Sequence, residues 1–506
     1  MTTTRRLPRA TPQSQGVDPD ALERLVETLD GVDDVHSLMV LRHGHVVAEA
    51  WWDPFVPEEP HRMFSVSKSV TATAVGLAVA EGLLTTHDRV LDLLPDDAPP
   101  DPGEHLAAMT VRDLLTMTSG HGADTMQFRF DNLHRPGDRW ARDILAAPVV
   151  HEPGTRFVYN TGATYLLSAI LHRLTGERLL DWLTPRLFAP LGISGATWEQ
   201  CPAGIDVGGY GLAITTEDLA TLGQLWLQRG RWGGTQLVPA GWIEEMTSFQ
   251  VPNGPDESPD WEQGYGYQFW RCRHDAYRAD GAFGQFCVVS PAHDAVVVLT
   301  SGTTETSREL EAVLDAVTSG MSDGGTAVPQ DGAGPFVPDG LAVARPRGSA
   351  HVPLADFVRG SSFVLADGAV DPATAEDGVP EPGSPDDHGR ELLRWHAVAV
   401  QQEGDRIELC WTPGPDQPWH TVVCGTGRWI TGSVRLAVGE IGVAGAAAWT
   451  AHDTLTARLV WRGTPFTLDV VLTFGGDGEG RHVELAVDQN VSFGPTALLR
   501  ATGLGA

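Results

Sequence analysis

The segment 65–84 (SVSKSVTATAVGLAVAEGLL) constrains the fold most, because it has helical length and is apolar almost all the way round. Only Lys68 and Glu81 carry charge in it. A helix that is apolar on every side must be buried on every side. We therefore expect a central helix inside a large core, which the 42% hydrophobic content of this 506-residue chain is ample to build.

Patterning divides the chain into two parts. Up to residue 318, helical periods alternate with a predicted hairpin at 37–52 and strand patterns between 277 and 300, which indicates an α+β domain. Residues 319–350 are rich in Gly, Pro, Ser and Asp without periodicity, as in a linker. We predict a loose tail at 1–14, the α+β domain at 15–318, the linker at 319–350 and a second domain at 351–506.

The second domain is predicted to be all-β, because short apolar runs are separated there by Gly, Pro and Asp. A sandwich or a barrel would fit this pattern. An acidic, Pro-rich stretch at 366–389 is expected to be a solvated loop. The predicted strands are 393–400, 406–411, 429–438, 447–461 and 466–474.

Charge and cysteine usage exclude several kinds of partner. The formal net charge of −31 disfavours nucleic acid and anionic membrane surfaces, because both would repel the chain. Five scattered cysteines without a C-x-x-C pair indicate free thiols in a reducing compartment, and we expect a cytoplasmic protein. Cys272 and His274 lack partners at zinc spacing, so we expect no metal and no cofactor. The sequence leaves open whether the chain forms a homo-oligomer.

Lys68 is the single lysine of the chain, and the other basic residues are arginines. Unlike arginine, lysine can lose its proton when it is desolvated. Lys68 lies three residues after Ser65, so the two side chains share one face of the predicted helix. A hydroxyl beside an amine that can take its proton is the arrangement that nucleophilic catalysis requires. Ser67 and Ser69 are the competing hydroxyls, but neither shares the face of Lys68.

The chain resembles the serine β-lactamase-like superfamily, which includes penicillin-binding proteins, class C β-lactamases, family VIII carboxylesterases and D-aminopeptidases. Ser65-x-x-Lys68 matches the first motif of that group. Further similar segments occur in the same order over residues 12–318: 112–120 (RDLLTMTSG), 153–162 (PGTRFVYNTG), 190–193 (PLGI), 208–212 (GGYGL) and 216–220 (TEDLA). The resemblance implies an antiparallel sheet flanked by helices, plus an all-α subdomain.

By the same resemblance, Tyr159 matches the tyrosine of the second motif, which serves as general base or proton shuttle. The motif's asparagine stands one position early here, at Asn160, and Thr161 occupies its usual place. We expect Asn160 or Thr161 to make the contact with substrate and with Lys68.

The third motif of the family, K-T-G or H-x-G on an edge strand, corresponds to the segment Ala279-Asp280-Gly281-Ala282. The resemblance implies an oxyanion hole made by the backbone N–H groups of Ser65 and Ala282, with Asp280 and Gly281 in the substrate-binding set. The family's lysine is absent, and with it a cation for a substrate carboxylate. We therefore expect poor turnover of β-lactams.

The leading hypothesis is a serine hydrolase for small esters or amides, with Ser65 as nucleophile and Lys68 and Tyr159 as general base. Acyl transfer or peptide cyclisation is the second enzyme hypothesis, since penicillin-binding-protein-type thioesterases also pair the catalytic domain with a β-rich, lipocalin-like domain. A β-lactamase or D-aminopeptidase type of amidase is a third. A catalytically silent binding protein is the alternative from another class.

Overall fold

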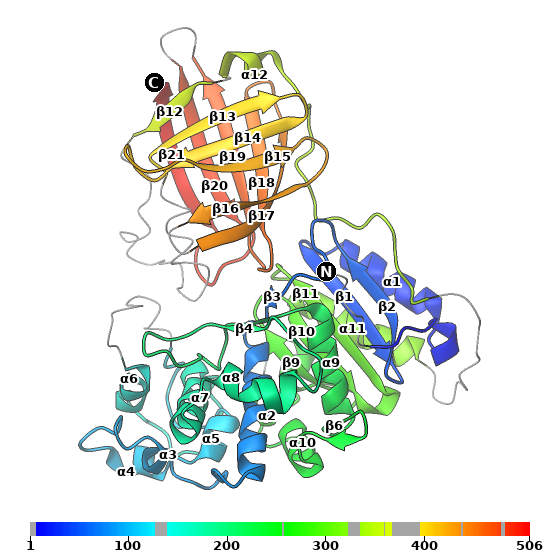
Figure 1. Ribbon diagram of the computed structural model, residues 1–506, viewed down its shortest axis with the longest axis vertical. Coiled ribbons are helices and arrows are strands. Elements are labelled where there is room, and N and C mark those ends of the chain that lie inside the picture. The colour runs from blue at the N-terminus through cyan, green and yellow to red at the C-terminus, as the bar shows by residue number, and fades with distance from the viewer. Residues whose placement is uncertain are drawn as a thin grey trace. The chain divides into compact units, whose positions relative to one another are not determined.

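The computed structural model describes residues 7–126, 139–255, 258–321, 334–358, 360–366, 395–436, 439–476 and 481–505. The chain divides into two compact units (Figure 1). Unit 1 comprises Met1–Ala50, Pro57–Ser301 and Glu305–Gly340, and unit 2 comprises Trp51–Val56, Gly302–Thr304 and Leu341–Ala506.

Unit 1 is built on a six-stranded sheet of order β2-β1-β11-β10-β9-β8 (Figure 1). Strand β1 pairs antiparallel with β11, and β10 pairs antiparallel with both β11 and β9. The predicted hairpin at 37–52 is present as β1 and β2. The strands are β1 (Val35–Arg42), β2 (His45–Trp51), β8 (Trp270–Arg271), β9 (Tyr277–Gly281), β10 (Gln285–Ser290) and β11 (Ala295–Ser301).

The predicted central helix is α2 (Val66–Ala80), in which every residue from Val66 to Ala78 is buried. It ends at Ala80 rather than at residue 84, because Gly82 takes a left-handed φ of 72° that interrupts the helix. Helix α2 packs on β9 and β10, and α9 (Thr216–Leu227) packs on β1, β10 and β11. Helices α1 (Pro19–Asp30) and α11 (Thr306–Gly320) pack against each other.

Most of the remaining helices of unit 1 gather around α7 (Thr161–Thr175), which contacts α2, α3, α5, α6 and α8, whereas α10 packs on α2. Two small strand pairings accompany them, one of order β3-β5-β4 and one of β6 with β7. The elements are α3 (Val90–Leu93), α4 (Gly103–Ala108), α5 (Val111–Leu115), α6 (Trp140–Ala146), α8 (Leu179–Leu183), α10 (Ala240–Thr247), β3 (His61–Arg62), β4 (Thr197–Trp198), β5 (Leu212–Ile214), β6 (Arg231–Trp232) and β7 (Thr235–Gln236).

The first described residues pack onto unit 1, so residues 7–14 are not the loose tail that we expected. Leu7 is buried. Arg9 forms ion pairs with Glu49 at 2.8 Å and with Glu217 at 2.7 Å. The carboxylates that hold this segment lie 40 and 208 residues further along the chain, so local composition could not reveal them.

Unit 2 is all-β, as predicted, and its sheet closes into a barrel. Ten strands pair in the order β15-β14-β13-β12-β21-β20-β19-β18-β17-β16, and β15 also pairs with β17. This parallel pairing closes nine strands and leaves β16 outside the ring. The elements are α12 (Pro353–Val358), β12 (Ser362–Leu365), β13 (Ala397–Glu403), β14 (Arg406–Thr412), β15 (His420–Gly425), β16 (Ile430–Leu436), β17 (Gly439–Trp449), β18 (Thr454–Trp461), β19 (Thr467–Gly475), β20 (His482–Gln489) and β21 (Ala497–Gly505).

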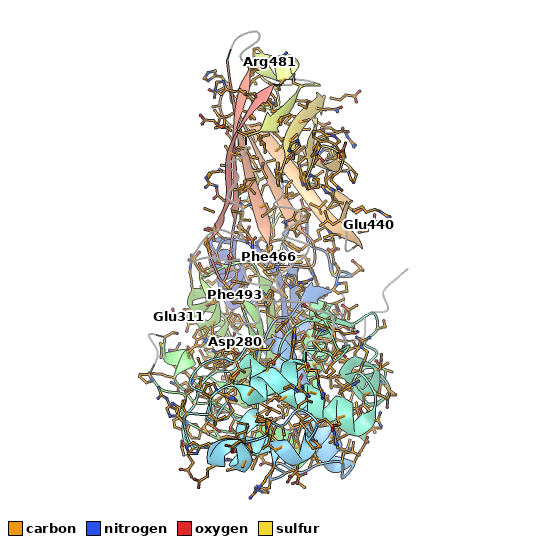
Figure 2. The ribbon with its side chains drawn as sticks, turned by 90° about the vertical axis from the view of Figure 1, so that its left-hand side faces the viewer. Asp280, Glu311, Glu440, Phe466, Arg481 and Phe493 are labelled. Atoms are coloured by element: carbon orange, nitrogen blue, oxygen red, sulfur yellow. The ribbon has the colours of Figure 1, made fainter. Side chains whose placement is uncertain are left out.

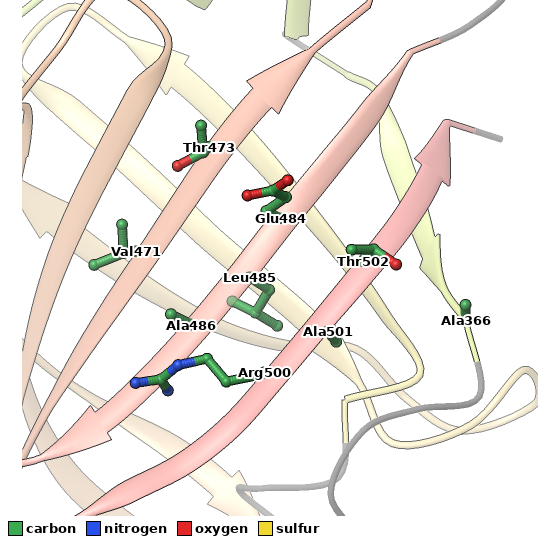
Figure 3. Close-up of a pocket in the computed structure, with 9 residues that line it drawn as sticks. All are labelled: Ala366, Val471, Thr473, Glu484, Leu485, Ala486, Arg500, Ala501 and Thr502. Atoms are coloured by element: carbon green, nitrogen blue, oxygen red, sulfur yellow. The ribbon is translucent and has the colours of Figure 1, made fainter.

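Alternation of burial along β19 and β20 shows which side chains fill the barrel. Stacked Trp395 and Trp411 lie in this core, with ring centroids 5.0 Å apart. On the outside of β19–β21, a depression of about 450 Å³ is lined by residues that include Thr473, Glu484 and Arg500 (Figure 3).

Two of the sequence predictions for the β region need comment. The single strand predicted at 447–461 is wrong: the chain turns between β17 and β18, where Thr450 N donates to Thr454 O. The loop predicted at 366–389 lies outside the described residues from 367 onward.

Within the predicted linker, Phe336 bridges to Ala48 in unit 1 and Ala342 bridges to Asp53 in unit 2. No helix among the described residues is long and apolar enough to cross a bilayer.

Candidate active site

Ser65 lies at the N-terminal end of α2, where it is the residue that precedes the first helical position. The preceding Phe64 has a left-handed φ of 45°, which is unfavourable for a bulky residue and turns the chain sharply into the helix. The Ser65 side chain remains half-buried, whereas the helix that follows is buried. The turn therefore presents one hydroxyl at the edge of a rigid element.

Lys68 is only 1% exposed, and its Nζ lies in contact with three oxygen atoms. It is 2.9 Å from Ser65 Oγ, 2.8 Å from Gly209 O and 3.4 Å from Thr161 Oγ1. Burial lowers the pKa of Lys68 to about 7, although the charges of Asp124 and Asp280 oppose this shift. Lys68 can therefore exchange its proton near neutral pH.

The three contacts of Lys68 define how a neutral amine would be oriented. A neutral amine has two N–H bonds and one lone pair. Gly209 O is a carbonyl and can only accept, so one N–H must face it. With the second N–H on Thr161 Oγ1, the lone pair faces Ser65 Oγ. This arrangement can take the proton of the Ser65 hydroxyl.

The competing hydroxyls are committed to other bonds. Ser67 Oγ accepts from the N–H of Leu212, and Ser69 Oγ donates to the carbonyl of Gln268 at 2.6 Å. Both side chains are buried. The structure thus brings Ser65, and neither of the other two serines, to the amine of Lys68.

Tyr159 lies beside Ser65 and Lys68. Its ring stacks on Trp270 with centroids 5.5 Å apart, and Lys68 Nζ lies 4.9 Å from its centroid. Burial raises the pKa of Tyr159, and a hydrogen bond with Ser65 lowers it by less. The phenol therefore keeps its proton at neutral pH and can donate it.

Asn160 has a structural role that excludes it from the substrate-binding set. Its Oδ1 accepts hydrogen bonds from Thr125 N, Thr125 Oγ1 and Gly162 N, so it caps α7. The side chain is fully buried. Of the two residues expected to reach Lys68, the structure gives that contact to Thr161.

Strand β9 brings the third motif beside the nucleophile. A side chain at Gly281 would place its Cβ only 2.3 Å from Met63 O, so glycine permits this close approach. The next residue, Ala282, is half-buried. Among the described residues, none accepts a hydrogen bond from the backbone N–H of Ser65 or Ala282. Both N–H groups are therefore available for a ligand.

Asp280, labelled in Figure 2, is the residue of β9 that precedes Gly281. Its Oδ2 accepts from Arg278 Nε at 2.8 Å. Arg278 is fully buried, and its guanidinium lies 4.4 Å from the ring centroid of Trp261. Burial raises the pKa of Asp280, and the positive charges of Arg278 and Lys68 oppose this shift. This segment thus carries the carboxylate of Asp280, and the cation paired with it, Arg278, is not exposed to solvent.

Sequence reasoning missed Asp124 and Arg278. Asp124 Oδ1 accepts from Thr161 N at 3.0 Å and from Met126 N at 2.9 Å, which places a second carboxylate near Lys68. No local pattern distinguishes Asp124 from other loop aspartates. Arg278 could have been found from its two-residue spacing to Asp280 on a predicted strand, which puts both side chains on one face.

Among the described residues, no cluster of three His, Cys, Asp or Glu side chains could hold a metal ion.

Comparison with known proteins identifies the class. The family model Beta-lactamase matches residues 23–322. The chain belongs to this family, and the predicted β-lactamase/transpeptidase-like fold with a β-rich C-terminal domain is confirmed.

Individual relatives refine this picture. The chain is 26% identical over 300 residues to the 6-aminohexanoate-dimer hydrolase of Paenarthrobacter ureafaciens, covering 55% of this chain and 74% of that protein. It is 26% identical over 149 residues to the lovastatin esterase of Penicillium rubens, covering 26% of this chain and 37% of the esterase. An octameric penicillin-binding protein homologue from Pyrococcus abyssi matches in structure with a TM-score of 0.50 at 15% identity, covering 96% of this chain and 99% of the homologue.

Proposed function

We propose that this protein is a serine hydrolase that cleaves small esters or amides through an acyl-enzyme on Ser65. The observation that carries the proposal is the contact of Lys68 Nζ with Ser65 Oγ at 2.9 Å, made by a buried amine whose pKa is about 7. Relatives named 6-aminohexanoate-dimer hydrolase and lovastatin esterase support this reaction class.

In the acylation step, Ser65 Oγ attacks the carbonyl carbon of the substrate while its proton passes to the lone pair of Lys68. The carbonyl oxygen becomes an oxyanion, which accepts hydrogen bonds from the N–H groups of Ser65 and Ala282. Backbone donors of this kind contribute about 10² to 10³ in rate each.

Collapse of the tetrahedral intermediate expels the leaving group. Tyr159, which keeps its proton because of burial, donates it to the departing oxygen or nitrogen. The ammonium of Lys68 then transfers its proton to Tyr159, which restores the phenol. Water attacks the acyl-enzyme by the same route in reverse, which releases the acid and regenerates Ser65.

The charges around the site favour neutral or cationic substrates. Asp124 and Asp280 both act on Lys68, while the nearby cation Arg278 is fully buried and paired with Asp280. A substrate carboxylate would be repelled by these two acids, and Arg278, which is paired with Asp280, is not exposed to bind it. We therefore infer that anionic acyl donors, including β-lactams, are poor substrates.

The test is a panel of short p-nitrophenyl esters, alkyl esters and anilides, with intact-protein mass recorded during turnover. We expect ester hydrolysis with a transient mass increase equal to the acyl group, absent in Ser65→Ala. Absence of hydrolysis and of the acyl adduct would contradict the proposal. A thioester-activated peptide in the same panel separates hydrolysis, which gives a free acid, from cyclisation.

The cellular setting is a separate inference. The five cysteines are all unpaired and buried, which fits a reducing compartment, so cytoplasmic localisation stays our prediction. Fractionation of the native host is the direct test.

A further inference from the structure

The turn that carries Ala282 accepts hydrogen bonds from one buried amide side chain. Gln285, the first residue of β10, is fully buried and pairs with Gly281 across the turn. Its Nε2 donates to Ala282 O at 3.1 Å, to Phe283 O at 3.1 Å and to Ser301 O at 2.7 Å. Its Oε1 accepts from Ser301 N at 3.4 Å. One side chain thus ties two carbonyls of the turn to strand β11.

The turn needs such support, because one of its non-glycine residues has an unfavourable backbone conformation. Phe283 has a φ of 66° and Gly284 a φ of 90°, and a left-handed φ is costly for a bulky residue such as Phe. Strained conformations persist only where the surroundings over-determine them. The two hydrogen bonds from Gln285 to the carbonyls of residues 282 and 283 supply that constraint.

A second buried group closes the space behind the turn. Glu309 on α11 is fully buried, and its Oε1 accepts from Ser301 Oγ at 2.5 Å. A Cβ at Gly284 would lie 2.5 Å from Glu309 Oε2, so the turn rests directly on this carboxyl group. Burial raises the pKa of Glu309 well above its usual value, which favours the neutral form of this carboxyl group beside the turn.

We propose that Gln285 is the positioning residue of the oxyanion hole: by fixing the carbonyls of Ala282 and Phe283 to Ser301, it aims the Ala282 N–H at the substrate oxygen. This inference rests on the proposed hydrolase function. Gln285 does not touch the substrate. Its effect should therefore fall on the transition state, where the N–H bond to the oxyanion matters most, and leave ground-state binding nearly unchanged.

The test compares Gln285→Met, which keeps the length of the side chain but donates nothing, with a matched control. Gln402 in unit 2 is also a buried glutamine, whose Nε2 donates to Ala350 O and Gly404 O. We expect Gln285→Met to lower kcat for a p-nitrophenyl ester about 10- to 100-fold with KM within about twofold. Gln402→Met should leave both constants unchanged. Active-site titration measures the concentration of active enzyme, so that kcat is calculated for folded molecules alone.

A second variant covers the case in which Gln285→Met does not fold. In Gln285→Glu, the protonated carboxyl keeps one donor for the turn, and ionisation replaces it with a charge facing carbonyl oxygens. We expect the ratio of variant to wild-type kcat to fall as pH is raised, with KM flat. A ratio near one at every pH, or a loss confined to KM, would overturn the proposal. If wild type itself does not turn over esters, the hydrolase function fails rather than the role of Gln285.

Discussion

Lys68 Nζ lies 2.8 Å from the carbonyl oxygen of Gly209, and this contact fixes the orientation of the amine. Because the carbonyl can only accept, one N–H of Lys68 always faces it. At its contact with Ser65 Oγ, the amine can then either donate a proton or accept one. The pKa of about 7 lets both states exist near neutral pH.

The first prediction concerns the pH dependence of activity. The neutral amine is the form that can accept the Ser65 proton, so kcat/KM should rise with pH up to about 7 and then level off. Lys68→Arg should lower kcat/KM by at least about 10³, because arginine does not deprotonate in proteins. Stopped-flow or steady-state ester hydrolysis between pH 5 and 9 measures both effects. A profile that is flat through this range would speak against Lys68 as the base.

The same pKa predicts a dependence of stability on pH. The folded-state pKa of Lys68 is about 7, below the usual 10.5, so between these values the unfolded chain binds one proton more than the folded chain. Stability must then rise with pH, by up to about 1.4 kcal/mol per unit from this group. Lys68→Met should lose this slope. Urea unfolding of both proteins from pH 7 to 10 compares the slopes, and equal slopes would refute the shifted pKa.

Tyr159→Phe tests the proton donor separately from the nucleophile. The ring should still stack on Trp270, so the melting temperature should change little. The rate should fall about 10²- to 10⁴-fold for alkyl esters and anilides, whose leaving groups need a proton. For p-nitrophenyl esters the loss should be smaller, because nitrophenolate leaves unprotonated. An equal loss for both kinds of leaving group would show that Tyr159 acts in another way.

The Arg278–Asp280 pair should matter for stability. Arg278 is fully buried, so Asp280→Asn leaves a buried cation without its counter-charge, which we expect to cost about 3–5 kcal/mol. Asp405→Asn removes an exposed partner of Arg428, and its cost in stability should be much smaller because solvent screens this pair. Urea denaturation of both variants measures the difference, and similar costs for the two would contradict the account.

Substrate charge gives a further prediction for the wild-type protein. Neutral p-nitrophenyl esters should be hydrolysed at least about 10²-fold more efficiently than nitrocefin, which carries a carboxylate. The reason is that the acidic side chains of Asp124 and Asp280, which both act on Lys68, repel an anionic substrate. Nitrocefin turnover at the rate of a dedicated β-lactamase would show that another group binds the substrate carboxylate.

The sequence was sufficient to predict the parts of this molecule that depend on local spacing. Ser65 and Lys68 lie on one helical face because they are three residues apart, and the apolar length of α2 demanded its burial. The alternating strands of unit 2 identified an all-β domain. In each case the physical cause acts within one element.

Contacts between distant segments were beyond such reasoning. The parallel pairing of Cys424 with Gly445 closes the barrel, and nothing in either strand's own pattern indicates it. The resemblance implied Asn160 or Thr161 as the substrate contact, yet the side-chain oxygen of Asn160 is used by Thr125, 35 residues earlier. Likewise, Arg278, the partner of Asp280, packs against Trp261 and donates to the carbonyl of Asp260. Both of these residues lie in a different segment of the chain.

Labelling by a fluorophosphonate probe, read as intact-protein mass and mapped by peptide digestion, tests the central claim most directly. We predict one adduct on Ser65 of the wild-type protein, absent in Ser65→Ala and formed far more slowly in Lys68→Arg. Ser67→Ala is the matched control and should still be labelled, because Ser67 Oγ accepts from Leu212 N instead of contacting Lys68. No adduct on the folded wild-type protein, or an adduct that persists in Ser65→Ala, would contradict an activated nucleophile at Ser65.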